Sequence, residues 1–197
     1  MPSWRAYLVG GNDVHTGKRT INANFADSQY CKMYSELLSN DKLLTFAKQT
    51  GYTIRFMSHP NMSGGTHLIQ MDKRVKLLDG SDITYRQIFG ESDLLVTDYS
   101  SVVFDFAYLR KPVLYLQADQ DEFFNGAHTY EKGYFDYEDD GFGEVAYDVE
   151  TLVDLMVGYM KSNCKLKEKY EDRINNTFPY SDKENCRRVY EAICNLK

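Results

Sequence analysis

Residues 93–116 read DLLVTDYSSVVFDFAYLRKPVLYL, and this stretch decides the fold class. Residues 93–96 form a short apolar run that is typical of a buried strand, and residues 102–109 predict a helix. Pro112 ends that helix, and residues 113–116 form a second apolar run of strand length. A strand, a helix and a strand at this spacing predict a βαβ unit. The fold class is therefore α/β, with a Rossmann-like parallel sheet that is flanked by helices.

The sequence on either side of this unit extends the same pattern. Helical spacing of apolar residues predicts helices over 28–38 and 41–48, and β-forming residues over 52–57 predict a strand. A short helix is expected over 82–89, capped by Ser81 or Asp82. The chain then closes with a helical tail, in which we expect three helices at about 149–161, 165–175 and 182–195.

Two stretches lack any regular period. Residues 10–24 are rich in Gly and Asn and predict a loop. Residues 117–147 show no helix or strand pattern, and a loop that long inside a compact domain is usually functional. No internal repeat or low-complexity linker divides the chain, so we expect residues 1–197 to form one domain.

Composition excludes several classes of protein. The 197 residues are 43% hydrophobic and 26% charged, which is typical of a globular domain rather than a disordered chain. No run of 18 apolar residues predicts a membrane span, and a net charge of −6 argues against a protein that coats nucleic acid. The four cysteines form no Cys-x-x-Cys pair, which argues against structural zinc and fits a reduced, cytoplasmic chain.

The negative charge is concentrated in one segment. Residues 119–144 hold nine acidic residues and a single base, Lys132, so this acidic segment carries −8 and the rest of the chain carries +2. The segment could bind a divalent cation through its carboxylates, or it could be a solvated or partner-facing surface. Because it is also rich in Phe and Tyr, we expect it to pack partly onto the domain and to wall one side of the site.

Polar side chains follow two of the predicted strands, where ligands bind in parallel α/β sheets. The segment 97–101, Thr-Asp-Tyr-Ser-Ser, comes after a buried strand and opens a helix. Free backbone N–H groups at a helix start, together with the hydroxyls of Thr97, Ser100 and Ser101, would suit a phosphate or pyrophosphate. The alternative is ordinary capping of the helix by Asp98 or Ser100.

A histidine follows the other strand, in the sequence Ser58-His59-Pro60. It could be a structural loop residue. Pro60 biases His59 toward an extended backbone, and an imidazole near a pyrophosphate could stabilise or protonate the departing phosphate. His128, inside the long irregular stretch, is the only other histidine that we consider for the site.

Taken together, these motifs resemble those of the CDP-glycerol glycerophosphotransferase family, the teichoic acid polymerases and primases of Gram-positive bacteria. Residues 92–107 resemble the signature of the family, and Ser58-His59-Pro60 resembles its His-Pro motif after a strand. Residues 2–5, Pro-Ser-Trp-Arg, are similar to its Pro-Thr-Trp-Arg motif. Residues 133–136 and 141–143 look like the loop that follows the last motif. The resemblance covers nearly the whole chain.

The resemblance implies a fold like the C-terminal half of a two-domain GT-B enzyme, which binds CDP-glycerol or CDP-ribitol. An alcohol phosphate would pass to a polymer acceptor and CMP would be released. His59 would be the catalytic residue that acts on the pyrophosphate. The substrate-binding candidates implied by position are Arg5, Ser3, Thr97, Asp98, Tyr99, Ser100, Ser101, Asp105 and His128.

Further expectations follow from the same resemblance. The chain opens on the Pro-Ser-Trp-Arg motif itself, so we expect a piece of a larger enzyme whose N-terminal domain would supply acceptor contacts and a second histidine. The full-length enzyme would be cytoplasmic and peripheral at the inner face of the membrane. No cofactor or metal is assigned, although a divalent cation remains compatible with the acidic segment. Alone, the chain would bind the donor but turn it over poorly.

Two other functions remain open at this point. One is the nucleotide-binding half of a GT-B glycosyltransferase that uses a nucleotide sugar. The other is an α/β binding or assembly module without catalysis.

Overall fold

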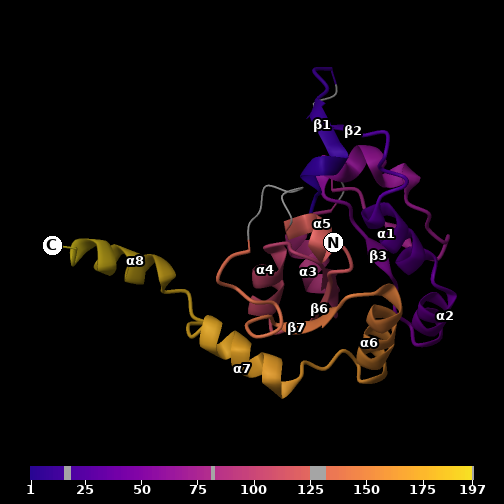
Figure 1. The fold of residues 1–197 in the computed structure, drawn as a ribbon. Coiled ribbons are helices and arrows are strands. Elements are labelled where there is room, and N and C mark those ends of the chain that lie inside the picture. The colour runs from indigo at the N-terminus through magenta and orange to yellow at the C-terminus, as the bar shows by residue number, and fades with distance from the viewer. Residues whose placement is uncertain (16–18, 81–82, 125–131, 197) are drawn as a thin grey trace.

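Three parallel strands form the centre of the protein, whose computed structural model describes residues 1–15, 19–80, 83–124 and 132–196 (Figure 1). The strands are β5 (Leu95–Thr97), β6 (Val113–Leu116) and β7 (Gly143–Ala146), in the order β5-β6-β7. Helix α4 (Val102–Tyr108) connects β5 to β6. The predicted βαβ unit is therefore confirmed, with each element within two residues of its expected bounds.

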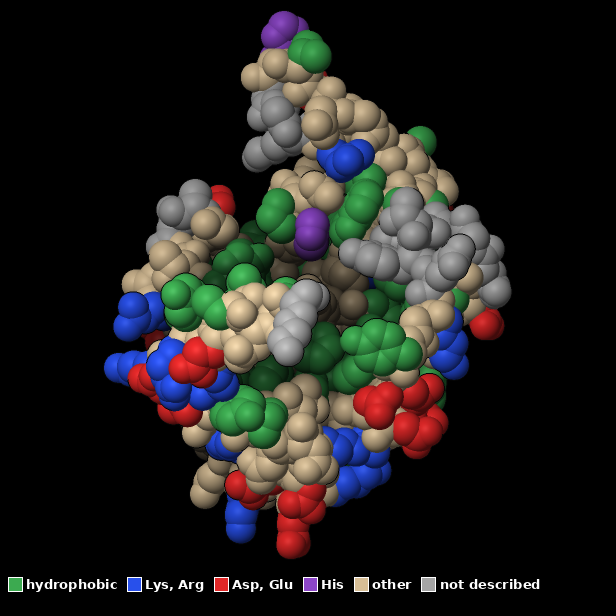
Figure 2. Space-filling model, turned by 90° about the vertical axis from the view of Figure 1, so that its left-hand side faces the viewer, with side chains coloured by type: hydrophobic (Ala, Val, Ile, Leu, Met, Phe, Trp, Pro, Cys, Tyr) green, Lys and Arg blue, Asp and Glu red, His purple; other side chains and the backbone are tan. Residues whose placement is uncertain are grey.

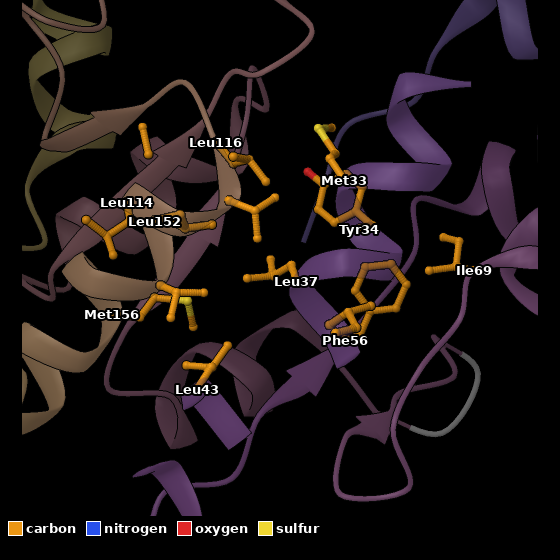
Figure 3. Packing of buried hydrophobic residues seen from close by; sticks show 14 of the residues in the cluster. Met33, Tyr34, Leu37, Leu43, Phe56, Ile69, Leu114, Leu116, Leu152 and Met156 are labelled. Carbon is orange, nitrogen blue, oxygen red and sulfur yellow. The ribbon is translucent and has the colours of Figure 1, made fainter. Parts of the chain in front are cut away.

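Side chains alternate between the two faces of β6, and each face has its own hydrophobic layer. Leu114 and Leu116 point to the layer that contains α1 (Gln29–Ser39) and α6 (Val149–Lys161), which Figure 3 shows at close range. Val113 and Tyr115 point to the other layer, with α4 and α7 (Glu168–Thr177). All four side chains are fully buried, so helices cover the sheet on both faces, as the α/β prediction requires.

A second, smaller sheet lies beside the first. Its strands β3 (Arg55–Phe56) and β4 (Lys76–Leu77) pair in parallel, and β3 is shorter than the predicted strand over 52–57. Helix α2 (Asp41–Gln49) begins at the Asn40 cap, within its predicted range. A cavity of about 290 Å³ is lined by residues of β3 and β5 together with core side chains from α1, α2 and α6.

One predicted boundary near these elements was wrong, and the predicted caps Ser81 and Asp82 lie outside the described residues. Helix α3 (Tyr85–Glu91) begins three residues later than expected, because Thr84 and Gln87 form a reciprocal capping box there. Residues 60–68 form a 3₁₀ helix, η2, directly after His59.

The predicted loop over 10–24 contains a β-hairpin instead. After a short 3₁₀ turn, η1 (Ala6–Leu8), strand β1 (Val9–Asn12) pairs antiparallel with β2 (Arg19–Ile21). The glycines obscure the strand pattern, whereas pairing of Val9 with Ile21 fixes the register. The hairpin stands out from the domain at the top of Figure 1.

The irregular stretch 117–147 also contains regular structure. A single helical turn, α5 (Gln120–Glu122), follows β6, and β7 ends the stretch. The β7 sequence Gly-Glu-Val-Ala has a weak strand propensity, so its strand depends on hydrogen bonding to β6. Gly143 is required there, because a Cβ atom at this position would lie 1.7 Å from the carbonyl oxygen of Val113.

The chain ends in the predicted helical tail of α6, α7 and α8 (Asn185–Cys194). No residue of α8 is buried, and this helix projects away from the domain (Figure 1). The helix begins three residues after its predicted start at 182, with Glu184 as an N-cap that makes no side-chain cap bond. None of the described helices has the length and apolar character needed to cross a membrane.

Candidate functional site

A hollow of about 530 Å³ opens at the carboxyl edge of the β5–β7 sheet. It is lined by side chains from several separate parts of the chain, and Figure 2 shows hydrophobic side chains gathered around the centre of this face, below the hairpin. The residues that contribute are Ser3, Trp4, His59, Tyr99, Ser100, Ser101, Gln117, Phe123, Phe124 and 132–138, with others. The sheet edge therefore brings together the two polar segments that the sequence singled out.

His59 lies where β3 leads into η2, and its position is fixed from two sides. Its Nδ1 accepts a hydrogen bond from the backbone N–H of Asn61 at 3.1 Å, and the Trp4 ring stacks on the imidazole with 6.3 Å between ring centroids. Burial lowers the pKa of His59, and the charge of Asp98 opposes this only in part. The imidazole is therefore neutral near pH 7, and because Nδ1 is the acceptor, Nε2 carries the proton and is a donor.

Ser100 and Ser101 line the hollow at the start of α4. Ser100 Oγ lies 3.4 Å from the backbone nitrogen of Val102, and Ser101 occupies the N-cap position without a side-chain cap bond. Of the predicted alternative, capping by Asp98 is not observed, since Asp98 bonds Ser3 and Arg5, whereas Ser100 does accept from the N–H of Val102 at the start of α4. The N–H groups of Val102, Val103 and Phe104 are bonded to Ser100 and Ser101 themselves, so the two serine hydroxyls are the donors that α4 offers to an anion in the hollow.

Beneath the hollow lies a buried cluster of one cation and two carboxylates. Arg5 Nε is 2.7 Å from Asp119 Oδ2, and Arg5 Nη2 is 3.0 Å from Asp98 Oδ2. All three side chains are fully buried. Asp98 Oδ1 also accepts from the backbone N–H and the hydroxyl of Ser3, at 2.8 Å and 2.6 Å. The cluster therefore ties the N-terminal segment to the ends of β5 and β6.

Aromatic rings cover the guanidinium of Arg5. Its Cζ lies 4.8 Å from the ring centre of Phe123 and 5.2 Å from that of Tyr99, and these two rings stack on each other at 3.8 Å. The Tyr99 hydroxyl donates to Asp119 at 3.3 Å. Burial raises the pKa of Tyr99, and the charge of Asp119 adds to this, so the hydroxyl stays protonated. The hollow therefore has a rigid aromatic floor.

This geometry changes the role expected for Arg5. The resemblance implied a phosphate contact, but its guanidinium is held by two carboxylates, is covered by rings and does not line the hollow. A direct phosphate contact would require Arg5 to leave both carboxylates buried without a cation, which is costly. In this structure Arg5 positions the floor instead.

The other predicted residues divide between the hollow and its surroundings. Ser3 and Tyr99 line the hollow, whereas Thr97 is buried beside it and donates to the carbonyl oxygen of Met1 at 2.8 Å. Asp105 is exposed on α4 and does not line the hollow. His128 lies outside the described residues.

The acidic segment forms one wall, as expected from its aromatic residues. Phe123 and Phe142 are buried in the domain, and residues 132–138 line the hollow. Asp136 is stabilised by N–H groups of its own loop, of which those of Asp139 and Glu138 lower its pKa most. Within the described part of the chain, no group of three or more His, Cys, Asp or Glu side chains could hold a metal ion.

Several residues of this site were not predicted as site residues. Asp119 was counted only within the acidic segment, although it stands three residues after the end of β6, where ligand-contacting side chains are expected. Gln117 stands even closer to that strand end, and Trp4 adjoins Arg5 in the Pro-Ser-Trp-Arg motif. Both residues follow the end of β6 closely, and this position in the sequence could have identified Asp119 and Gln117 as site residues.

Comparison with known proteins finds relatives that match most of the chain. The model of the family CDP-Glycerol:Poly(glycerophosphate) glycerophosphotransferase matches residues 1–195. Over 198 residues the chain is 37% identical to the minor teichoic acid biosynthesis protein GgaB of Bacillus subtilis, covering 100% of this chain and 21% of GgaB. It is 30% identical over 119 residues to a teichoic acid poly(glycerol phosphate) polymerase of Bacillus spizizenii, covering 60% of this chain and 24% of that protein.

The fold is also similar to solved structures of the wall teichoic acid polymerase TagF. One of them aligns with a TM-score of 0.58 at 19% identity, covering 98% of this chain and 41% of TagF. Another, a TagF variant soaked with CDPG, aligns over the same share of both chains with a TM-score of 0.53 at 18% identity. The chain thus spans less than half the length of these relatives. On the match to the family model, it belongs to the CDP-glycerol:poly(glycerophosphate) glycerophosphotransferase family.

Proposed function

We propose that this chain binds CDP-glycerol or CDP-ribitol and forms the donor-binding part of a transferase. The enzyme would pass the alcohol phosphate to a teichoic-acid-like or capsular polymer and release CMP. One observation carries the proposal: His59 and the Ser100–Ser101 pair, about 40 residues apart in the chain, line one hollow at the carboxyl edge of the sheet. Membership of the family and the TagF structure soaked with CDPG support it.

The proposed reaction is a phosphoryl transfer. A hydroxyl oxygen of the acceptor forms a bond to the β-phosphorus, the bond from that phosphorus to the CMP oxygen breaks, and the hydroxyl proton passes to a base. The hydroxyls of Ser100 and Ser101 hold the phosphate oxygens. The neutral His59 donates from Nε2 to the phosphoryl or leaving oxygen, where negative charge develops. Such catalysis depends mostly on positioning and charge stabilisation.

The remaining parts of the proposal concern the whole enzyme. A further domain would supply the acceptor site and the base, since the relatives are more than twice as long as this chain. The polymer acceptor would bring the enzyme to the inner face of the membrane.

A binding titration tests the donor site. We expect calorimetry to show saturable binding of CDP-glycerol by the unmodified chain and at least about tenfold weaker binding by the double variant Ser100→Ala, Ser101→Ala. The reason is that a hydrogen bond to a charged group contributes about 1.5–3 kcal/mol. Ser63→Ala, on an exposed part of η2, is the matched control and should bind like the unmodified chain.

Competition separates the remaining candidates. If UDP-sugars displace CDP-glycerol at lower concentration than CDP-ribitol does, a nucleotide-sugar transferase is favoured. Absence of saturable CDP-glycerol binding by the unmodified chain would contradict the proposed function and leave a binding module without a donor site.

A further inference from the structure

One buried polar side chain in the hollow has no role in the contacts described so far. Gln117 is only 1% exposed and lines the hollow, yet neither its carboxamide nitrogen nor its oxygen has a hydrogen-bond partner in the described structure. Two other buried side-chain atoms share this condition, Tyr30 Oη and Ser58 Oγ, but neither residue lines the hollow. Burying an amide without partners costs free energy, so a site that keeps one there is built for a ligand.

The backbone of Gln117 explains why its side chain enters the hollow. Its N–H donates to the carbonyl oxygen of Ala146 at 2.8 Å, which continues the pairing of β6 with β7 by one residue. Strand alternation then places Gln117 on the same face as Val113 and Tyr115, the face that α4 covers. The side chain is therefore fixed by the central strand of the sheet rather than by a loop.

The register of the sheet places Gln117 next to the proposed phosphate site. Thr97 on β5 pairs with Tyr115 on the neighbouring strand β6. Gln117 follows Tyr115 by two residues, and Ser100 and Ser101 follow Thr97, so both segments leave the same edge of the sheet on adjacent strands. In a CDP-alcohol the β-phosphate is bonded to the α-phosphate on one side and to the alcohol on the other. With the pyrophosphate held at Ser100 and Ser101, the alcohol is the uncharged group that can lie against the Gln117 carboxamide.

The surroundings favour a hydroxyl group over an anion. A carboxamide offers one acceptor oxygen and one donor nitrogen, and so matches two neighbouring hydroxyls. Asp136 and Glu138 also line the hollow, and their carboxylates accept hydrogen bonds from hydroxyls but repel phosphates. The rings of Phe124 and Tyr137 line it as well and suit the carbon skeleton of a polyol.

From this placement we infer that Gln117 binds two hydroxyls of the polyol that is transferred. The inference rests on the proposed function and adds a residue that recognises the transferred group rather than the nucleotide. A site built to bond a hydroxyl discriminates strongly against a ligand that lacks it.

Titration of two ligands against two proteins tests the inference. Gln117→Met keeps the length of the side chain and removes both polar atoms. We expect this variant to bind CDP-glycerol about tenfold more weakly than the unmodified chain, and CDP, which has no glycerol, with unchanged affinity. Gln49→Met, on the exposed end of α2, is the matched control. In urea unfolding without ligand, Gln117→Met should be at least as stable as the unmodified chain, because it removes an unpaired buried amide.

The outcomes separate this inference from the proposed function. If Gln117→Met binds CDP-glycerol as tightly as the unmodified chain, or loses affinity for CDP to the same extent, the inference is overturned and the function stands. Clear destabilisation of the ligand-free variant would give Gln117 a structural role and would also overturn it. If the unmodified chain binds neither ligand, the proposed function is contradicted, and this inference with it.

Discussion

Replacing Arg5 with Met is expected to destabilise the fold by about 3–5 kcal/mol, which is the usual cost of removing one partner of a buried ion pair. Arg5 is fully buried between Asp98 and Asp119, and its removal leaves both carboxylates without a cation. Those carboxylates hold Ser3 and the Tyr99 hydroxyl, so the floor of the hollow should loosen together with the fold. Urea unfolding followed by circular dichroism measures the effect.

Two further variants test whether the loss of stability in Arg5→Met comes from the buried carboxylates. Arg187→Met removes two surface ion pairs, with Glu184 and Glu191, and should leave the urea midpoint unchanged, since exposed pairs contribute little. Adding Asp98→Asn and Asp119→Asn to Arg5→Met should recover part of the lost stability, because the uncompensated charges are then gone. An Arg5→Met variant as stable as the unmodified chain would show that the cluster does not hold the floor.

The second large effect is expected from Gly143→Ala, which should destabilise the fold by about 3 kcal/mol or more. The added Cβ would lie 1.7 Å from the carbonyl oxygen and 2.6 Å from the carbonyl carbon of Val113, both backbone atoms of the central strand. The overlap with Val113 is relieved only if β7 moves away from β6. This movement also displaces the acidic segment that forms one wall of the hollow. Urea unfolding measures the loss.

Gly158→Ala is the matched control for this substitution. Gly158 lies on the exposed face of α6 with nothing within 4 Å of an added Cβ. Alanine in a helix interior is favoured over glycine by up to about 1 kcal/mol, so this variant should gain stability. Equal effects of the two substitutions would contradict the close approach of β7 to β6.

The parts of the fold that the sequence predicts are those with strong local signals. An apolar run, a helical period and Pro112 define β5, α4 and β6 without reference to any other segment. The hairpin of β1 and β2 and the strand β7 lack such signals, because glycines and a glutamate occupy their positions. They form through pairing with a partner strand, which a local pattern does not contain.

The same distinction applies to the site. His59, Ser100 and Ser101 could be predicted because each stands just after a strand, where parallel sheets bind ligands. The pairing of Arg5 with Asp119 joins residues 114 positions apart and depends on how the N-terminal segment crosses the ends of the strands. The position of Gln117 just after β6 is visible in the sequence, whereas its burial and its lack of hydrogen-bond partners depend on the packing around it.

Binding of the donor in the hollow at the carboxyl edge of the sheet can be observed residue by residue. The isotope-labelled chain is titrated with CDP-glycerol, and the backbone amide resonances are followed in NMR spectra. We expect the largest shifts at His59, Ser100, Ser101 and Gln117, with none on the exposed helix α8. Largest shifts at residues around the separate cavity between β3 and β5, such as Leu43 and Met156, would contradict binding in the hollow.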